Sequence, residues 1–315
     1  MTAFLVRRLI QAFIVVIGVT IIVFAIIHVL PGGPARALLG PRATPFQVEH
    51  FIVENGYNHP LYVQYLTFLG RVVRGNLGYS YHYDQSVISL LGEDLPKSAL
   101  LVGLAYIVAI GIGIPLGLVQ AVRRNKPFDY VVTSLALIGY SMPVFWLGIL
   151  LILLLSVQFG LFPSEGPQGA TVWAVLQDPL GMVLPVATLA IGTVALFSRY
   201  MRSSALENLV QDYIRTARAK GVAEPAILRK HLLRNSVIPI ITLIGLSLPA
   251  VLSGAVVVES VFNYPGMGLL FWNAATTHDF PLLLGFTLVI AVATVVGSLV
   301  ADLLYAVADP RVRYT

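Results

Sequence analysis

Cysteine is absent from this chain of 315 residues, and charged side chains make up only 11% of it. Without a thiol, the chain can form no disulfide bond, no thiolate metal site and no cysteine nucleophile. An ordinary soluble domain is about one quarter charged, so the low charge argues against that class. Hydrophobic residues instead account for 57% of the chain, which identifies an integral membrane protein.

The motifs of common catalytic sites are also missing. The sequence contains no phosphate-binding glycine loop followed by Lys-Ser or Lys-Thr, no His-Glu-x-x-His pair and no Gly-x-Ser-x-Gly turn. Its six histidines are scattered without the spacing of metal ligands. We therefore expect no enzyme activity, no cofactor and no metal on this chain.

Six apolar blocks approach the length of about 20 residues that a helix needs to cross a bilayer. They predict an all-α integral membrane protein with six transmembrane helices. The blocks are 9–30, 98–122, 131–159, 181–198, 237–258 and 282–303. The predicted organisation is a first helix within 1–30, an outer region with short helices at 31–97, and a five-helix core at 98–315 that contains a polar loop at 199–236.

Basic residues are unevenly distributed between the segments that connect these blocks. Most of the 20 Lys and Arg residues fall on one side if the N-terminus is cytoplasmic, Arg311 and Arg313 among them. The outer region holds the others, which are Arg36, Arg42, Arg71, Arg74 and Lys97. Positive charge accumulates in cytoplasmic loops. We therefore predict a multi-pass protein of the plasma or inner membrane with both termini inside, its basic residues near lipid headgroups, and no nucleic-acid partner.

The polar segment 199–236, called the basic loop below, is the most charge-dense part of the second half of the chain. Its apolar residues from Leu206 to Ala217 recur at helical spacing. Gly221 then provides a helix stop, and Pro225 suits the first turn of a second short helix. A basic knob of this kind either anchors at lipid headgroups or binds another protein, and periodicity alone favours neither.

Two places in or near the predicted spans are candidates for a translocation path or gate. Pro143 removes a backbone hydrogen bond from the third span, and Ser141 can satisfy the freed carbonyl. The kink at Ser141, Met142 and Pro143 either lines a passage or only serves helix packing. Glu259 and the nearby Phe262 lie at the outer end of the fifth span. There, the Glu259 carboxylate either extends to the headgroups or faces a polar passage.

Between their ends, predicted spans two to six contain no Asp, Glu, Lys, Arg or His, and Asp302 lies at the end of the sixth. Ion-coupled transporters usually carry such groups as proton or ion relays. The pattern therefore favours a membrane bundle that takes its energy from a soluble partner through the basic loop. A stand-alone secondary transporter or channel is the alternative.

Several motifs occur along nearly the whole chain. They are HVLPGGP at 28–34, PLYVQYL at 60–66, RGNLGYS at 74–80, SMPVFWLG at 141–148, ESVF at 259–262, PGMG at 265–268 and DPRVRY at 309–314. The segments 212–221 and 231–239 look like the loop known as the EAA motif. On these motifs the chain resembles the permease subunits of ATP-binding cassette importers. The likeness is to the dipeptide, oligopeptide and nickel group, and to the first of its two permeases.

The resemblance implies the six-helix fold of importer permeases, with a cytoplasmic coupling-helix loop as in MetI. The implied partners are a second permease, two ATPase subunits or domains that bind ATP and Mg, and an extracytoplasmic substrate-binding protein. The substrate would be a di- or oligopeptide, or else nickel or a glutathione-like compound.

The resemblance also implies that the segment 212–235 couples the permease to the ATPases. Within the loop, 206–220 would extend the fourth span, and 221–235 would meet the ATPase. The residues implied at the coupling contact are Ala217, Ala219, Lys220, Gly221, Glu224, Ile227, Leu228, Arg229, Lys230, His231, Arg234 and Asn235.

Overall fold

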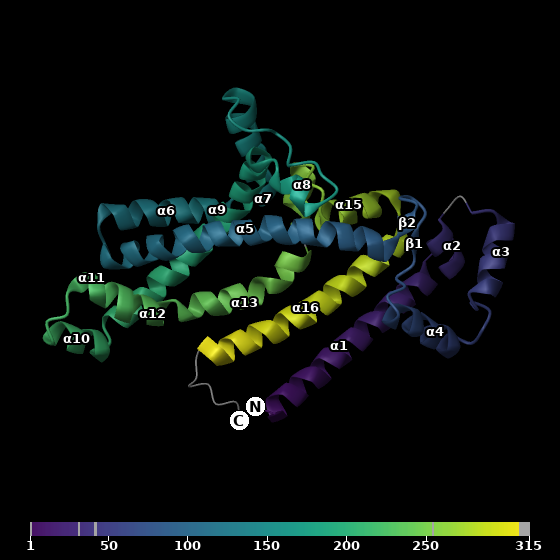
Figure 1. Cartoon of the computed structure of the whole chain (residues 1–315), viewed down its shortest axis with the longest axis horizontal. Helices are drawn as coiled ribbons and strands as arrows, with labels where there is room; N and C mark the ends of the chain where they lie inside the picture. The colour runs from purple at the N-terminus through teal and green to yellow at the C-terminus, as the bar shows by residue number, and fades with distance from the viewer. Residues whose placement is uncertain (1, 31, 41–42, 254, 309–315) are drawn as a thin grey trace.

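The computed structural model of this chain describes residues 2–30, 32–40, 43–253 and 255–308. Helices dominate it, and Figure 1 shows long helices in a bundle with shorter ones at its two ends. The interpretations made from the sequence for Pro31, Arg42, Arg311, Arg313 and the motif at 309–314 lie outside the described residues.

Four helices in the described part of the chain are each long and apolar enough to cross a membrane. They are α1 (Thr2–Val29), α5 (Val87–Val122), α9 (Pro179–Leu209) and α16 (Phe280–Ala308). These helices coincide with four of the six predicted spans, and the prediction of an all-α membrane protein is confirmed.

The predicted fifth span falls on α13 (Ile238–Ser253), which has 16 residues. At 1.5 Å per residue α13 is about 24 Å long, which is less than the roughly 30 Å of a bilayer core. The predicted span also includes residue 254, which lies outside the described residues. The count of six spans therefore stays a prediction.

The predicted third span is divided into two helices. The first, α6 (Pro127–Ser141), is followed by α7 (Val144–Leu151) and the π-helical turn η1 (Ile152–Gln158), and the two parts are bent by 105°. Proline disfavours the helical conformation in the residue before it, and Met142 is extended, with φ −74° and ψ 128°. The predicted kink is therefore a complete break, after which α7 stands away from α6 (Figure 1).

The outer region contains α2 (Gly33–Leu39), α3 (Pro45–Glu54) and α4 (Leu61–Val73). A capping box begins α3, because the Thr44 hydroxyl accepts a hydrogen bond from the N–H of Gln47 and the Gln47 side chain accepts one from the N–H of Thr44. The helix α4 is held on α1 by a hydrogen bond between the hydroxyls of Thr20 and Tyr65 (2.9 Å) and by one between His28 and Gln64 (2.9 Å). A two-stranded antiparallel hairpin, β1 (Tyr79–Ser80) and β2 (Gln85–Ser86), leads into α5.

The shorter elements of the core connect the long helices along the chain. They are α8 (Val172–Leu176) before α9; α10 (Asp212–Ala219), α11 (Glu224–Ala226), the π-helical η2 (Ile227–Leu232) and α12 (Leu233–Ser236) between α9 and α13; and α14 (Val256–Val261) and α15 (Met267–Thr277) before α16.

The helices α5 and α9 form the most extensive helix pair of the described structure. Two glycines of α5 let them approach to backbone contact. A Cβ atom on Gly117 would lie 2.4 Å from the Ser198 carbonyl oxygen, and one on Gly113 would lie 2.9 Å from the Cβ of Phe197. Since neither approach tolerates a larger side chain, α5 and α9 form a closely packed support for the segment that follows α9.

Candidate functional site

The basic loop begins as a direct extension of α9, which runs past the predicted span end at residue 198 to Leu209. The expected extension of the fourth span over 206–220 is therefore present as far as Leu209. The helix predicted over 206–217 is interrupted, because Gln211 is extended (φ −74°, ψ 152°) and α10 starts again at Asp212. The helix stop predicted at Gly221 and the helix start predicted at Pro225 are both confirmed. Gly221 has a φ of +73°, and Pro225 lies in the first turn of α11.

A small apolar core holds the basic loop together. Its buried residues come from α5, α9, α10 and η2, and they are Ala121, Ala205, Ile214, Ala217, Ile227 and Leu232. Leu228 is partly buried and packs against the same core. The interpretation of Ala217 and Ile227 as contact residues is therefore wrong for this structure. Their apolar side chains are buried inside the loop, so they fix its shape and face no partner.

The other residues predicted at the coupling contact are exposed, except His231, which is partly buried. The exposed ones are Ala219, Lys220, Gly221, Glu224, Arg229, Lys230, Arg234 and Asn235. Glu224 is already paired within the loop, because Arg218 Nε donates to its Oε1 at 2.6 Å. This hydrogen bond lowers the pKa of the Glu224 carboxyl below its ordinary value.

Four basic residues of the loop are not paired in this way. Among the described residues, no carboxylate lies within ion-pair distance of Lys220, Arg229, Lys230 or Arg234. We call these four side chains the cationic face. Their charges are available to an anionic partner.

A hollow of about 270 Å³ lies beside the break in the predicted third span. It is lined from α6, α7, α9 and the segment between α6 and α7, by Gly139, Tyr140, Met142, Val144, Leu147, Thr188, Leu189, Gly192, Thr193 and Leu196. Of the candidate path residues only Met142 lines it, while Ser141 and Pro143 are exposed next to it. The hydroxyls of Thr188 and Thr193 donate to carbonyls of their own helix, so the hollow is largely apolar.

Glu259 does not face a passage, and it does not extend to lipid headgroups. Its side chain is 0% exposed and accepts four hydrogen bonds from the protein. Oε1 accepts from the Ser98 hydroxyl (2.7 Å) and the Ala255 N–H (3.0 Å). Oε2 accepts from the N–H groups of Gly268 (2.6 Å) and Leu269 (3.2 Å), in the first turn of α15. Both sequence interpretations of Glu259 are therefore wrong, since it joins α5, α14 and α15.

The interpretation of Phe262 as a residue of the path or gate is also wrong for this structure, because its side chain is fully buried in a core with Leu184 and Val258. The two motifs at 259–262 and 265–268 belong to this one junction. A Cβ atom on Gly266 would lie 2.5 Å from both the Glu259 carboxylate and the Ser98 hydroxyl, so this glycine is required by close approach. A carboxylate that precedes a glycine-flanked helix start indicates the contact with α15, but no local signal points to Ser98 of α5, which lies 161 positions away in the sequence.

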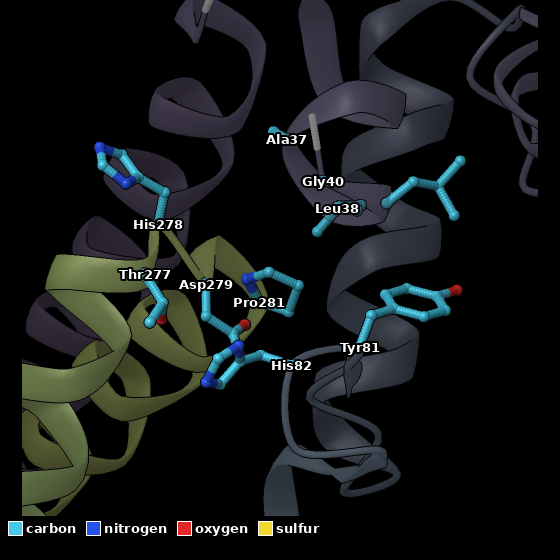
Figure 2. Close-up of a pocket in the computed structure, with 10 residues that line it drawn as sticks. Ala37, Leu38, Gly40, Tyr81, His82, Thr277, His278, Asp279 and Pro281 are labelled. Carbon is cyan, nitrogen blue, oxygen red and sulfur yellow. The ribbon is translucent and has the colours of Figure 1, made fainter. Parts of the chain in front are cut away.

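A hollow of about 520 Å³ lies at the end of the bundle that carries α2 (Figure 2). It is lined by the end of α2, by Tyr81 and His82 of the β1–β2 turn, and by the segment that joins α15 to α16. Both carboxylate oxygens of Asp279 in that segment accept hydrogen bonds, one from the Ser80 hydroxyl and one from the N–H of Leu282 at 3.2 Å. The sequence reading placed no site here, because the lining segments are far apart in the chain.

A bundle of apolar helices with a compact basic loop at one end is the architecture of a multi-pass membrane protein. Residues 113–314 match the family described as the binding-protein-dependent transport system inner membrane component, and residues 1–102 match the N-terminal family of the same membrane components. The chain belongs to this family. The resemblance to importer permeases is thereby confirmed.

Curated relatives are similar over the full length of the chain. The oligopeptide transport system permease protein AppB of Bacillus subtilis (strain 168) is 40% identical over 316 residues, with 100% of both chains covered. The dipeptide transport system permease protein DppB of Escherichia coli (strain K12) is 36% identical over 340 residues, with 100% of this chain and 99% of DppB covered. These relatives are transport permeases and not enzymes.

Among solved structures, one inward-facing form of the MetNI methionine ABC transporter contains a chain of the same fold. The TM-score is 0.55 at 18% sequence identity, and the match covers 70% of this chain and 97% of that one. At this identity the likeness establishes the fold alone.

Proposed function

We propose that this chain is one of two permease subunits of an ATP-driven importer of di- or oligopeptides and forms half of its translocation path. The observation that carries the proposal is the full-length similarity to two permeases named for oligopeptide and dipeptide transport. The assembly would contain a second permease, two ATPase subunits or domains that bind ATP and Mg, and an extracytoplasmic binding protein.

The proposed orientation places the basic loop and both termini in the cytoplasm. The uneven distribution of Lys and Arg supports this orientation. In Figure 1 the start of α1 lies toward the end of the bundle that carries α10–α12, and α2–α4 lie toward the opposite end. The outer region and its hollow would then face the binding protein.

The proposed contact with the ATPases is the cationic face of the basic loop. Its four charges lie on a support that the buried core of Ile214, Ala217, Ile227 and Leu232 keeps in shape. A short helix with a charged exposed side fits the groove of a partner with acidic residues. The loop would thus receive the movement of the ATPases and pass it to α9, with which it is continuous.

Reconstitution in liposomes tests the proposed function. The chain, its second permease, the ATPases and the binding protein should together import a labelled dipeptide or oligopeptide only when ATP is supplied. Omission of the ATPases should abolish uptake. Peptide movement by this chain alone would refute the importer and support the stand-alone transporter or channel. Competition by unlabelled peptide, nickel and glutathione then identifies the substrate class within the family.

A further inference from the structure

Asp129 and Arg202 form a two-point ion pair that joins α6 to α9. Arg202 Nε donates to Asp129 Oδ1 at 2.7 Å, and Arg202 Nη2 donates to Asp129 Oδ2 at 2.8 Å. The N–H of Asn125 adds a third hydrogen bond to the carboxylate at 3.1 Å. The Asp129 side chain is only 2% exposed. A planar arginine fork that is bound at both nitrogens fixes the relative position of two elements more closely than a single contact does.

This ion pair is the most specific attachment of α6. Much of the α6 surface is exposed, and its exposed large side chains are Tyr130, Val131, Leu135, Leu137, Ile138 and Tyr140. Other contacts with the long helices are a hydrogen bond from Gln120 of α5 to Thr133, at 3.2 Å, and the guanidinium of Arg199 of α9, which lies over the Tyr140 ring at 5.2 Å from its centroid. Asp129 therefore holds the first turn of α6 on α9, and the other end of α6 stops at the break before Pro143.

Arg202 lies on the part of α9 that leads directly into the basic loop. Ala205, one turn further along, is already part of the loop core, and α9 continues without interruption to Leu209. A displacement of the loop therefore reaches Arg202 through one continuous helix. On its other side α9 is in backbone contact with α5 at Gly117, so α5 and α9 are expected to move together.

We propose that Asp129 and Arg202 are positioning residues that transmit movement of the basic loop from α9 to α6. The hollow near Met142 has walls from both helices, and the break at Met142 and Pro143 provides a hinge between α6 and α7. When α9 moves, the ion pair carries α6 with it, and the hollow changes shape at the hinge. This inference rests on the proposed function, because it names the connection between the proposed coupling contact and the proposed path.

The test measures the number of ATP molecules hydrolysed per peptide imported by the reconstituted assembly. Asp129→Asn keeps the side-chain shape but removes the charge, and Arg202→Lys keeps the charge but loses the fork. Each variant should raise the ratio of ATP to peptide at least about threefold. The exchange Asp129→Arg with Arg202→Asp should bring the ratio back toward that of the native chain. Glu207→Gln is the matched control, because it removes an exposed carboxylate from the same helix and should leave the ratio unchanged.

A second measurement follows the two helices directly. Since the chain contains no cysteine, spin labels can be attached at Leu135→Cys on α6 and Tyr200→Cys on α9, both of which are exposed positions. With the ion pair intact, the distance distribution between the labels should stay narrow through the ATP cycle. With Arg202→Lys it should broaden.

The outcomes separate this inference from the proposed function. ATP-driven import by the native chain, together with a native ATP-to-peptide ratio and an unchanged distance distribution in both variants, would overturn the ion-pair proposal and leave the importer intact. Failure of the native assembly to import peptides with ATP would overturn the proposed function itself. If Asp129→Asn fails to fold, Arg202→Lys decides the question by the same two readouts.

Discussion

Replacement of Glu259 by Gln should destabilise the outer junction between α5, α14 and α15. The substitution keeps the shape of the side chain but turns one carboxylate oxygen into an amide that donates. In the native chain all four groups that face the carboxylate are donors, namely the Ser98 hydroxyl and the backbone N–H groups of Ala255, Gly268 and Leu269. The glutamine amide nitrogen can take the place of either Oε1 or Oε2, and in both places it faces two of these donors.

The less costly orientation can be identified from the contacts. An amide nitrogen at the Oε2 position would leave two backbone N–H groups without an acceptor. At the Oε1 position it could donate to the Ser98 hydroxyl, and only the N–H of Ala255 would lose its acceptor. One unsatisfied buried donor costs about 1–3 kcal/mol. We expect a loss of this size in the free energy of unfolding, which corresponds to a fall of several degrees in Tm.

Thermal unfolding of the purified protein in detergent, followed at one fixed scan rate, measures the effect. The matched control is Glu165→Gln, because Glu165 is an exposed carboxylate in the loop before α8. A surface substitution of this kind should change stability by no more than about 0.5 kcal/mol. If Glu259→Gln unfolds at the same temperature as the native chain and the control, the proposed capping role of Glu259 is refuted.

Three further predictions concern the basic loop and its support. Reversal of two charges of the cationic face, Arg229→Glu with Lys230→Glu, should abolish ATP-driven uptake while the protein still inserts. The charge-conserving exchange Arg229→Lys with Lys230→Arg should retain uptake. Normal uptake by the charge-reversed variant would contradict the proposed contact. Gly117→Ala should cost about 1–3 kcal/mol, measured by thermal unfolding, because the added methyl group meets backbone of α9. The Arg218–Glu224 pair lowers the pKa of Glu224, so its contribution should be present above the ordinary glutamate pKa of about 4.3 and be lost as the pH falls through the lower folded value. Hydrogen exchange of α10 and α11 against pH should show this loss in the native chain but not in Glu224→Gln, and identical pH profiles would exclude a role for the pair.

Local features of the loop and the outer region could be predicted because their causes lie within a few residues. Gly221 needs only its own freedom to adopt a positive φ, and Thr44 and Gln47, three residues apart, cap α3. The burial of Ala217 and Ile227 was not predicted, although they follow an apolar periodicity. Periodicity shows that residues share a face, but it does not show whether that face meets the chain's own core or a partner.

The sequence by itself determined the membrane class, most of the long helices and the position of the basic loop, because apolar runs and charge distribution are properties of the chain in order. Only the tertiary structure decided the role of Glu259, whose carboxylate is bound by a hydroxyl 161 positions away in the sequence. The same is true of Asp129 and Arg202, which are 73 positions apart. Whether a charged group is buried and paired, or exposed and free to bind, depends on which distant segments the fold brings to it.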